Sequence, residues 1–416
     1  MDIIVAHPTG NKNVRAVISG FEDNKVLKRF VTTIALNNNT TWLKYLPKSV
    51  KNELLRRSFQ LNNSAYLKGF PSIEIKRLLF TKIPFLKNRI NNRLAVDNLY
   101  TQFDAKVVEY LKKTSKVQHI DAVYAYEDGA LQTFKYAKSI GIKNIYDLPI
   151  AYWEKTRALL ADEALRLPNW ANTLGGGITD SKEKLQRKTM ELQEADVVVV
   201  PSKFVLDSLP DWASGKRVIF SPFGSPNAGV EMAFKKTKAH FTKKSPLRVL
   251  FAGSMGQRKG LGDLFEAIKL LNTDNVQLVV LGSLLAPMGF YQNILPNFIH
   301  EKVRPNHQVL ELMRSCDVFC LPSVVEGRAL VMQEAMSQGL PLIITPNTGG
   351  EDLVIEGNTG FLVPVRSPES IAAAIQKILD SPANLETMGQ QAFLHAATYS
   401  WQKYSDNIVN ALKSII

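Results

Sequence analysis

The chain has 416 residues, 45% hydrophobic and 21% charged, with a formal net charge of +13, and this length favours two domains of roughly 200 residues each. No apolar run approaches the roughly 18 to 20 residues that span a bilayer, and the first five residues lack a basic leader, so we expect a cytoplasmic protein. The two cysteines, Cys316 and Cys320, have a spacing that suits neither a redox pair nor a zinc site, so we interpret them as core thiols.

The first half of the chain alternates short apolar runs with helical stretches. The runs that predict strands are residues 3–6, 30–34, 122–125, 144–146, 197–200 and 218–220. Strands that are apolar throughout and separated by helices are typical of a parallel sheet that is covered on both faces. We therefore predict an α/β domain with a parallel sheet over residues 1–221.

A basic segment interrupts this pattern. Between Lys44 and Arg93 twelve residues are basic and two are acidic, a local balance of +10, and apolar residues are interleaved with them. A basic amphipathic segment over residues 42–93 can dock on an anionic membrane surface, whereas a solvated basic face with its apolar residues in the core is the alternative. Nucleic-acid binding is a third interpretation, but no recognition motif accompanies the charge, so we expect no nucleic-acid partner.

Residues 222–246 are rich in proline, glycine and lysine and show no periodicity, so we interpret them as an interdomain linker. The alternation then resumes. The predicted strands are residues 248–252, 276–281, 318–321 and 342–344, and the predicted helices are residues 261–271, 309–313 and 330–337. We predict a second Rossmann-like domain over residues 247–400, followed by an amphipathic helix at residues 401–416.

Glu326 and Glu334 are the most informative residues of the second half. Glu326 lies in the loop after the strand at 318–321, and Glu334 lies one turn into the helix at 330–337. Ligands bind at this edge of an open parallel sheet, and a helix N-terminus there presents N–H groups to a phosphate. Two carboxylates beside an anion are unfavourable unless each binds hydroxyl groups. A nucleotide sugar supplies this combination, whereas an exposed helix face is the alternative interpretation of the pair.

A glycine-rich loop follows the strand at 248–252 and reads Gly253-Ser254-Met255-Gly256-Gln257-Arg258-Lys259-Gly260. Glycines allow the backbone to turn beside an anion, and Arg258 and Lys259 supply positive charge for a diphosphate leaving group. The chain holds neither an Asp-x-Asp motif at a strand end nor a cluster of histidine, cysteine and acidic residues with metal spacing. We therefore predict no metal and no cofactor.

The two glutamates continue into Gly339-Leu340-Pro341-Leu342-Ile343-Ile344-Thr345, Gly349-Gly350-Glu351-Asp352 and Gly357-Asn358-Thr359-Gly360-Phe361-Leu362-Val363. With the glycine-rich loop, this ordered run resembles the signature of retaining glycosyltransferases of the family 4 (group 1) type, over roughly residues 247–370. The resemblance implies the GT-B fold, in which two Rossmann-like domains face an interdomain cleft. It also implies that the helix at 401–416 packs back on the first domain.

The resemblance assigns roles to residues of the second domain. Glu326 would face the donor sugar, Glu334 would accept hydrogen bonds from the ribose hydroxyls, and Lys259 is the family's lysine. The donor phosphates would meet the glycine-rich loop and the backbone that follows Glu326, at Gly253, Ser254, Gly327, Arg328, Ala329, Leu330 and Val331. Many members carry arginine where this chain has Ser254, and we expect Arg258 to replace it, which makes Glu326, Arg258 and Lys259 the predicted catalytic residues.

The family also has a cleft-lining loop in the first domain, close to the donor phosphate and the acceptor. The residues predicted to line the acceptor side of the cleft are Gly10, Asn11, Glu127 and Asp147. Lys12 and Arg15 are further candidates, and a capped helix start is the alternative for this segment. Many relatives carry a histidine near residues 148–150 that touches the donor sugar; this chain has none, which leaves Glu127 or Asp147 as stand-ins.

The function that these features predict is a retaining, metal-independent transfer of a sugar from a nucleotide-diphosphate sugar to a hydroxyl acceptor. The expected acceptor is a glycan or glycolipid in surface polysaccharide or glycolipid synthesis, at the inner face of the membrane. Two alternatives share the fold, a nucleotide-sugar epimerase and a non-catalytic scaffold at the membrane surface. A dehydrogenase is less attractive because no G-x-G-x-x-G follows either first strand.

Overall fold

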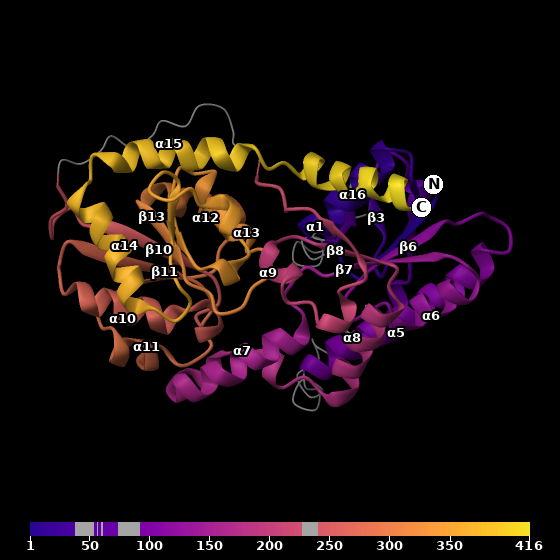
Figure 1. Ribbon diagram of the computed structural model, residues 1–416, viewed down its shortest axis with the longest axis horizontal. Coiled ribbons are helices and arrows are strands. Elements are labelled where there is room, and N and C mark those ends of the chain that lie inside the picture. Colours follow the sequence, from indigo (N-terminus) through magenta and orange to yellow (C-terminus); the bar gives the residue numbers. More distant parts are fainter. Residues whose placement is uncertain (38–53, 56, 60, 74–91, 227–239) are drawn as a thin grey trace.

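The computed structural model describes residues 1–37, 54–55, 57–59, 61–73, 92–226 and 240–416. Figure 1 shows two lobes side by side, each with a β-sheet between helices. In the described residues the first lobe holds a seven-stranded sheet and the second a six-stranded sheet, and every neighbouring pair of strands in them is parallel. The prediction of two parallel-sheet α/β domains is confirmed.

The first sheet is built around a strand that is buried at every position, β1. In spatial order its strands are β5 (Leu67–Gly69), β2 (Leu27–Thr32), β1 (Ile3–Ala6), β6 (Ala122–Tyr126), β7 (Lys143–Asp147), β8 (Val197–Val200) and β9 (Arg217–Phe220). Helices described in this half of the chain include α1 (Lys12–Asp23), α5 (Asn92–Thr114), α6 (Leu131–Ser139), α7 (Trp153–Arg166), α8 (Lys182–Glu194) and α9 (Lys203–Leu206). All six predicted strands are present, and β5 escaped prediction because only one of its three residues is apolar.

The second sheet is built around β10, which follows the linker. In spatial order its strands are β12 (Ile299–Glu301), β11 (Val276–Leu281), β10 (Leu247–Ala252), β13 (Val318–Leu321), β14 (Leu342–Ile344) and β15 (Gly360–Leu362). The helices are α10 (Leu261–Leu271), α11 (Met288–Ile294), α12 (Asn306–Ser315), α13 (Leu330–Met336), α14 (Pro368–Asp380) and α15 (Asn384–Ala397). The four predicted central strands are present, whereas the two short edge strands were not predicted.

The last helix, α16 (Trp401–Ile415), returns to the first lobe. Its apolar face, with Ile408 and Leu412, joins the core cluster that β1 and α1 form. The approach is close, because a Cβ on Gly20 of α1 would overlap the side chain of Ser405. Figure 1 shows α15 running along the second lobe and α16 continuing onto the first, where both ends of the chain lie.

The segment from α7 to the 3-10 helix η4 (Gly176–Ile178) corrects the predicted range of the first domain, residues 1–221. Trp170 of the 3-10 helix η3 (Pro168–Thr173) is buried in the core of the second lobe, with Phe265 as a ring neighbour. Arg166 of α7 is 2.7 Å from a carboxylate oxygen of Asp263 on α10. The chain therefore crosses to the second lobe between β7 and β8, and this lobe contains a segment from the first half of the sequence.

Most of the basic segment predicted at residues 42–93 lies outside the described residues, as does most of the linker predicted at residues 222–246. Both cysteines are buried thiols, as expected for core residues. No helix in the described ranges is long and apolar enough to cross a membrane.

Candidate active site

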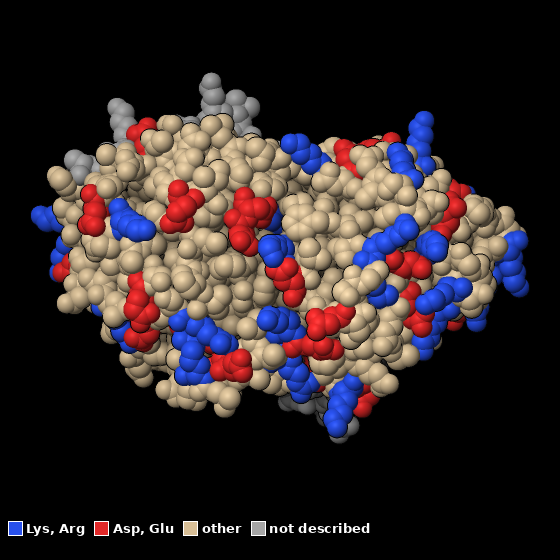
Figure 2. Space-filling model, viewed as in Figure 1, with Lys and Arg blue, Asp and Glu red and all other residues tan. Residues whose placement is uncertain are grey.

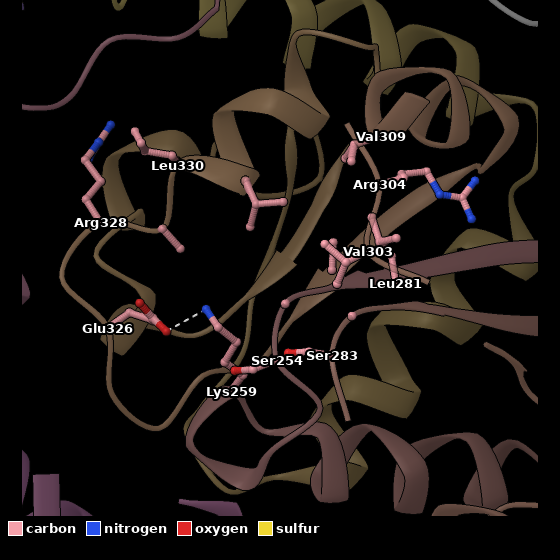
Figure 3. Close-up of a pocket in the computed structure, with 15 residues that line it drawn as sticks. Ser254, Lys259, Leu281, Ser283, Val303, Arg304, Val309, Glu326, Arg328 and Leu330 are labelled. Carbon is pink, nitrogen blue, oxygen red and sulfur yellow. Dashed lines mark hydrogen bonds and ion pairs between the residues drawn. The ribbon is translucent and has the colours of Figure 1, made fainter. Parts of the chain in front are cut away.

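A pocket of about 480 Å³ opens in the second lobe, where β10, β11 and β13 end (Figure 3). The predicted donor-binding and catalytic residues that line it are Gly253, Ser254, Lys259, Glu326, Arg328, Ala329, Leu330 and Val331. Lining residues that were not predicted are Ala252, Leu281, Gly282, Ser283, Val303, Arg304 and Val309. The turn after β11 could have been predicted to line the pocket, because β11 ends at the same edge of the sheet as β10.

The glycine-rich loop positions Lys259. Gly253 has a φ of +155°, and a Cβ there would overlap the aliphatic part of the Lys259 side chain, so only glycine leaves room for this lysine. The N–H of Gly253 is donated to the carbonyl oxygen of Leu281 at 2.9 Å. Gly253 therefore contributes space for the lysine, rather than the backbone contact to phosphate that the sequence suggested.

Glu326 brings the two predicted cations together. Its Oε1 atom lies 2.6 Å from Nζ of Lys259 and 3.2 Å from a guanidinium nitrogen of Arg258 (Figure 3 draws the lysine contact). The Lys259 and Glu326 side chains are only 13% and 12% exposed. Two cations share one carboxylate here, which leaves a local excess of one positive charge beside the pocket. Such an excess attracts a diphosphate.

The loop after Glu326 is held by the segment that follows β14. The Ala329 N–H is donated to the carbonyl oxygen of Thr348 at 3.2 Å, so the prediction that this N–H meets a donor phosphate is corrected. The Arg328 side chain turns away from the pocket (Figure 3) and forms two hydrogen bonds to the Asp352 carboxylate. Only the backbone of Arg328 is left to face a ligand.

Glu334 lies at the junction of the two lobes. Its Oε1 atom accepts hydrogen bonds from Lys12 at 2.5 Å and from Asn306 at 3.1 Å. Lys12 belongs to the first turn of α1, so the sheet edges of the two lobes meet here. Glu334 is not among the residues that line the pocket. In this structure, a ribose hydroxyl would have to compete with Lys12 for the carboxylate.

Two further contacts join the loop after Glu326 to the first lobe. The Gly327 carbonyl oxygen accepts a 2.6 Å hydrogen bond from Ser202, and the Gln333 amide donates to the Phe223 carbonyl oxygen at 2.7 Å. Gly327 is not among the pocket-lining residues, and a Cβ on it would overlap the carbonyl oxygen of Pro149. The predicted donor contact of Gly327 is thus corrected to an interdomain contact.

The predicted acceptor loop in the first lobe has structural roles. The Asn11 side chain caps α1 by accepting a 3.1 Å hydrogen bond from the N–H of Val14, which is the alternative considered for this segment. Gly10 lies so close to the ring of Phe59 that a Cβ would overlap it. Neither residue lines the donor pocket. Neither lines a second cavity, which lies between the lobes and is described below.

Asp147 also requires a correction, because its side chain does not reach the cleft. The residue is 1% exposed, and its carboxylate accepts hydrogen bonds from Tyr124 at 2.5 Å and from Tyr404 at 3.4 Å. Burial raises the pKa of Asp147 to about 7, although the tyrosine hydrogen bonds favour the charged form. Asp147 therefore belongs to the interior of the first lobe, under α16.

Glu127 lies beside this second cavity, of about 360 Å³, between the lobes. Its Oε2 atom is 3.3 Å from the ammonium group of Lys188, which lines this cavity together with Asp180 and Lys184. From the second lobe Ser254 and Arg258 line it. The sequence indicated Glu127 because it follows β6, but the lysines lie on α8, far from any recognised motif.

No group of three or more histidine, cysteine or acidic side chains in the described ranges is arranged to hold a metal ion. The charged residues that line the donor pocket are Lys259, Arg304, Glu326 and Arg328, and the side chain of Arg328 turns away. Arg258 contacts Glu326 from outside the lining.

Comparison with known proteins agrees with this geometry. A family model described as "Glycosyl transferases group 1" matches residues 233–395. A D-inositol 3-phosphate glycosyltransferase from Corynebacterium glutamicum (strain R) is 30% identical over 265 residues, which are 56% of this chain and 63% of that protein. The chain thus spans less than two thirds of the length of the curated relatives it matches first.

Two solved structures extend the likeness to the whole chain. Sucrose-phosphate synthase from Thermosynechococcus elongatus superposes with a TM-score of 0.63 at 17% identity, over 100% of this chain and 99% of that one. Anabaena Alr3699/HepE, in complex with UDP-glucose, gives a TM-score of 0.60 at 16% identity, with 100% of both chains covered. The chain therefore has the GT-B fold, and its residues 233–395 match the family model of the group 1 glycosyl transferases.

Proposed function

We propose that this protein is a retaining glycosyltransferase that moves a sugar from a nucleoside diphosphate sugar to a hydroxyl acceptor without a bound metal. The observation that carries the proposal is the Lys259–Glu326 pair, with a 2.6 Å contact, in the wall of a 480 Å³ pocket at the carboxyl ends of parallel strands. That edge is where ligands bind in open α/β sheets.

The proposed reaction depends on the negative charge that develops on the leaving diphosphate. As the bond between the sugar and the diphosphate breaks, negative charge grows on the leaving oxygen, and Lys259 and Arg258 stand beside the pocket to stabilise it. Glu326, which holds both cations, is then free to accept hydrogen bonds from sugar hydroxyls. A donor phosphate oxygen takes the proton of the acceptor hydroxyl on the face that the leaving group vacates, so the sugar keeps its anomeric configuration.

The comparisons support the substrate class. The group 1 match covers the lobe that contains the pocket, and HepE, which has the same fold, was solved with UDP-glucose. We further propose that the acceptor is a glycan or glycolipid made at the inner membrane surface, because the basic segment at residues 42–93 suits an anionic membrane. Co-sedimentation with phosphatidylglycerol vesicles tests the membrane part independently of activity.

Thermal-shift measurements with UDP-, GDP-, ADP- and dTDP-sugars test donor binding. With the donor that stabilises the protein, release of the nucleoside diphosphate is then measured with and without acceptors, and proton NMR reports the anomeric configuration of the product. We expect stimulated release, retention and no loss of rate in EDTA. Stabilisation by no donor would contradict the proposal, and an epimerised donor formed without acceptor would favour the epimerase.

A further inference from the structure

The cavity of about 360 Å³ between the lobes adjoins the donor pocket. Ser254 lines both cavities, and Arg258, which lines the interlobe cavity, contacts Glu326 of the donor pocket. The volume lies within the range of about 300–1,000 Å³ that small-molecule sites have. A molecule bound here would lie next to the place where the sugar–phosphate bond of the donor must break.

The charged groups of this cavity are matched in pairs. Lys184 is 3.1 Å from Asp180 and 3.5 Å from Asp128, and Lys188 is 3.3 Å from Glu127 and 3.7 Å from Asp128. Asp180 lines the cavity, whereas Glu127 and Asp128 are not among its lining residues, and Asp128 is also 3.3 Å from Arg187. Both ammonium groups therefore have carboxylate partners. Burial alone would lower the pKa of Lys188, but these carboxylates outweigh burial and raise it, so the ammonium group stays charged.

The third cation of the cavity, Arg258, lies 3.2 Å from Glu326, which it shares with Lys259, and the excess positive charge of this cluster serves the donor diphosphate in the proposed function. A phosphate binds where charged donors can turn to it, and moving a dianion beside carboxylates without a spare cation is costly. Among the described residues, every cation that lines the cavity already has a carboxylate partner. The cavity is therefore a poor site for a phosphorylated acceptor.

A hydroxyl group suits the same surroundings, because it donates to a carboxylate and accepts from an ammonium group at once. Glu127 is not among the lining residues and its Oε1 atom is fully buried, so this carboxylate holds Lys188 in place rather than contacting a ligand. Apolar side chains also line the cavity, among them Trp153, Leu160 and Leu174. A lining that combines apolar side chains with charged groups fits a sugar ring, which has apolar faces and a polar rim.

We propose that this cavity binds the acceptor as an uncharged glycosyl unit, whose hydroxyls are held by Asp180, Lys184 and Lys188. This rests on the proposed function and adds the acceptor class to it. The acceptor would differ from the phosphorylated one that the name of the D-inositol 3-phosphate glycosyltransferases implies for those proteins.

The first test compares matched acceptors and needs no variant. Diphosphate release from the donor is measured with glucose and glucose 6-phosphate, galactose and galactose 1-phosphate, and myo-inositol and its 3-phosphate. We expect the neutral member to have at least a tenfold higher kcat/KM in every pair that is used. Preference for a phosphorylated member overturns the proposal, and so does a lack of stimulation by all neutral members while the donor binds and is slowly hydrolysed.

The second test uses variants of the cavity. Lys184→Met and Asp180→Asn each remove one partner of the acceptor hydroxyls, and we expect the acceptor KM to rise about 10- to 100-fold. Lys182→Met, on an exposed lysine of the same helix, is the control and keeps the wild-type acceptor KM. Lys184→Arg should restore part of the affinity, which a purely structural role would not predict.

An unchanged acceptor KM in Lys184→Met and Asp180→Asn, in proteins that keep the wild-type melting temperature, overturns the assignment of the cavity. Failure of the unmodified protein to bind or hydrolyse any nucleoside diphosphate sugar counts against the proposed function instead. Donor binding and acceptor choice are therefore judged by separate measurements.

Discussion

Lys259 and Glu326 are 67 residues apart in the chain, and their side chains meet because each lies in the segment after a strand, β10 or β13, of the same sheet. The pair is mostly buried, so the attraction between ammonium and carboxylate is screened less than at the surface. A diphosphate that enters the pocket would replace Glu326 as the partner of the Lys259 ammonium group. The carboxylate would then face the donor sugar with Arg258 as its remaining cation.

Replacing Lys259 by methionine tests this arrangement. The chain keeps a side chain of similar length but loses the charge that stabilises the leaving group, and we expect kcat for transfer to fall about 10²–10³-fold. Lys269→Met, which removes an exposed lysine of α10, is the matched control. Rates are measured as diphosphate release, with melting temperatures as a check on folding. A fall of less than threefold would contradict the catalytic role.

Asp147 predicts how stability depends on pH. Its pKa is about 7 in the folded protein and 3.8 ordinarily, so between about pH 4 and 7 the folded state holds a proton that the unfolded state has released. The contribution of Asp147 to the free energy of unfolding therefore falls as pH rises, by up to about 1.4 kcal/mol per pH unit, and levels off above pH 7. Asp147→Asn cannot titrate, so its stability should fall less steeply between pH 5 and 7.

Urea unfolding at pH 5, 6, 7 and 8 measures this difference. Glu191, whose pKa burial raises to about 8, contributes a similar slope to both proteins and cancels in the comparison. Asp211→Asn, which removes an exposed carboxyl, is the control and should keep the wild-type slope. Parallel curves for the wild type and Asp147→Asn would show that Asp147 is ionised in the folded protein at pH 5.

At the scale of elements, α7 and η3 connect the lobes most strongly. Glu163 of α7 is fully buried between Arg166 and Arg366, with ion pairs of 2.6 and 2.7 Å. Ala151, Leu160 and Leu174 pack with Val324 and Val325 in an apolar cluster of their own. The segment therefore belongs to the second lobe by packing, although it lies between β7 and β8 of the first.

The ring contacts of Trp170 in η3 test whether this segment belongs to the second lobe. Trp170→Ala leaves a cavity among Phe265, Phe290 and Tyr291, and we expect it to destabilise the second lobe by about 3–5 kcal/mol. Trp212→Ala, at a position that is 48% exposed, should change stability by less than about 0.5 kcal/mol. Urea unfolding followed by hydrogen exchange assigns the loss to a lobe. A loss confined to β1 to β9 would contradict the packing.

At the scale of the whole molecule, the two lobes contact each other around the loop after Glu326. Ser202 reaches the Gly327 carbonyl, Lys12 reaches Glu334, and Gln333 reaches the Phe223 carbonyl. These three contacts are polar, and relative motion of two domains is the default expectation unless their interface is large and apolar. Figure 2 shows acidic and basic side chains interspersed over the described surface of this face, across both lobes.

Gly327→Ala tests whether this contact matters for turnover. A methyl group here would overlap the Pro149 carbonyl oxygen and the Ile150 Cα, so the lobes must separate to admit it. We expect a larger radius of gyration in X-ray scattering and at least a tenfold fall in turnover, because closure excludes water and completes the site. Gly289→Ala is the control, since nothing lies within 4 Å of a Cβ there. An unchanged radius with normal turnover would contradict the role of the contact.

The two parallel sheets and eight of the fifteen residues that line the donor pocket could be predicted from sequence patterns. Apolar runs such as Val197–Val200 must be buried on both faces, and residues after parallel strands share one edge of a sheet, so Lys259 and Glu326 could be expected to meet. Short edge strands such as β5 and β15 were missed because three residues show no period.

Which individual side chains of distant segments meet became visible only in the folded protein. The burial of Asp147 under Tyr404 depends on a helix 257 residues further along the chain, and the contact of Lys12 with Glu334 joins residues 322 apart. The burial of Trp170 in the core of the second lobe likewise depends on residues far from it in the chain. Local sequence patterns indicate whether a residue prefers burial. Packing between the lobes depends on the shapes of the two surfaces and on which charged groups pair across them. The spacing of residues along one segment predicts neither.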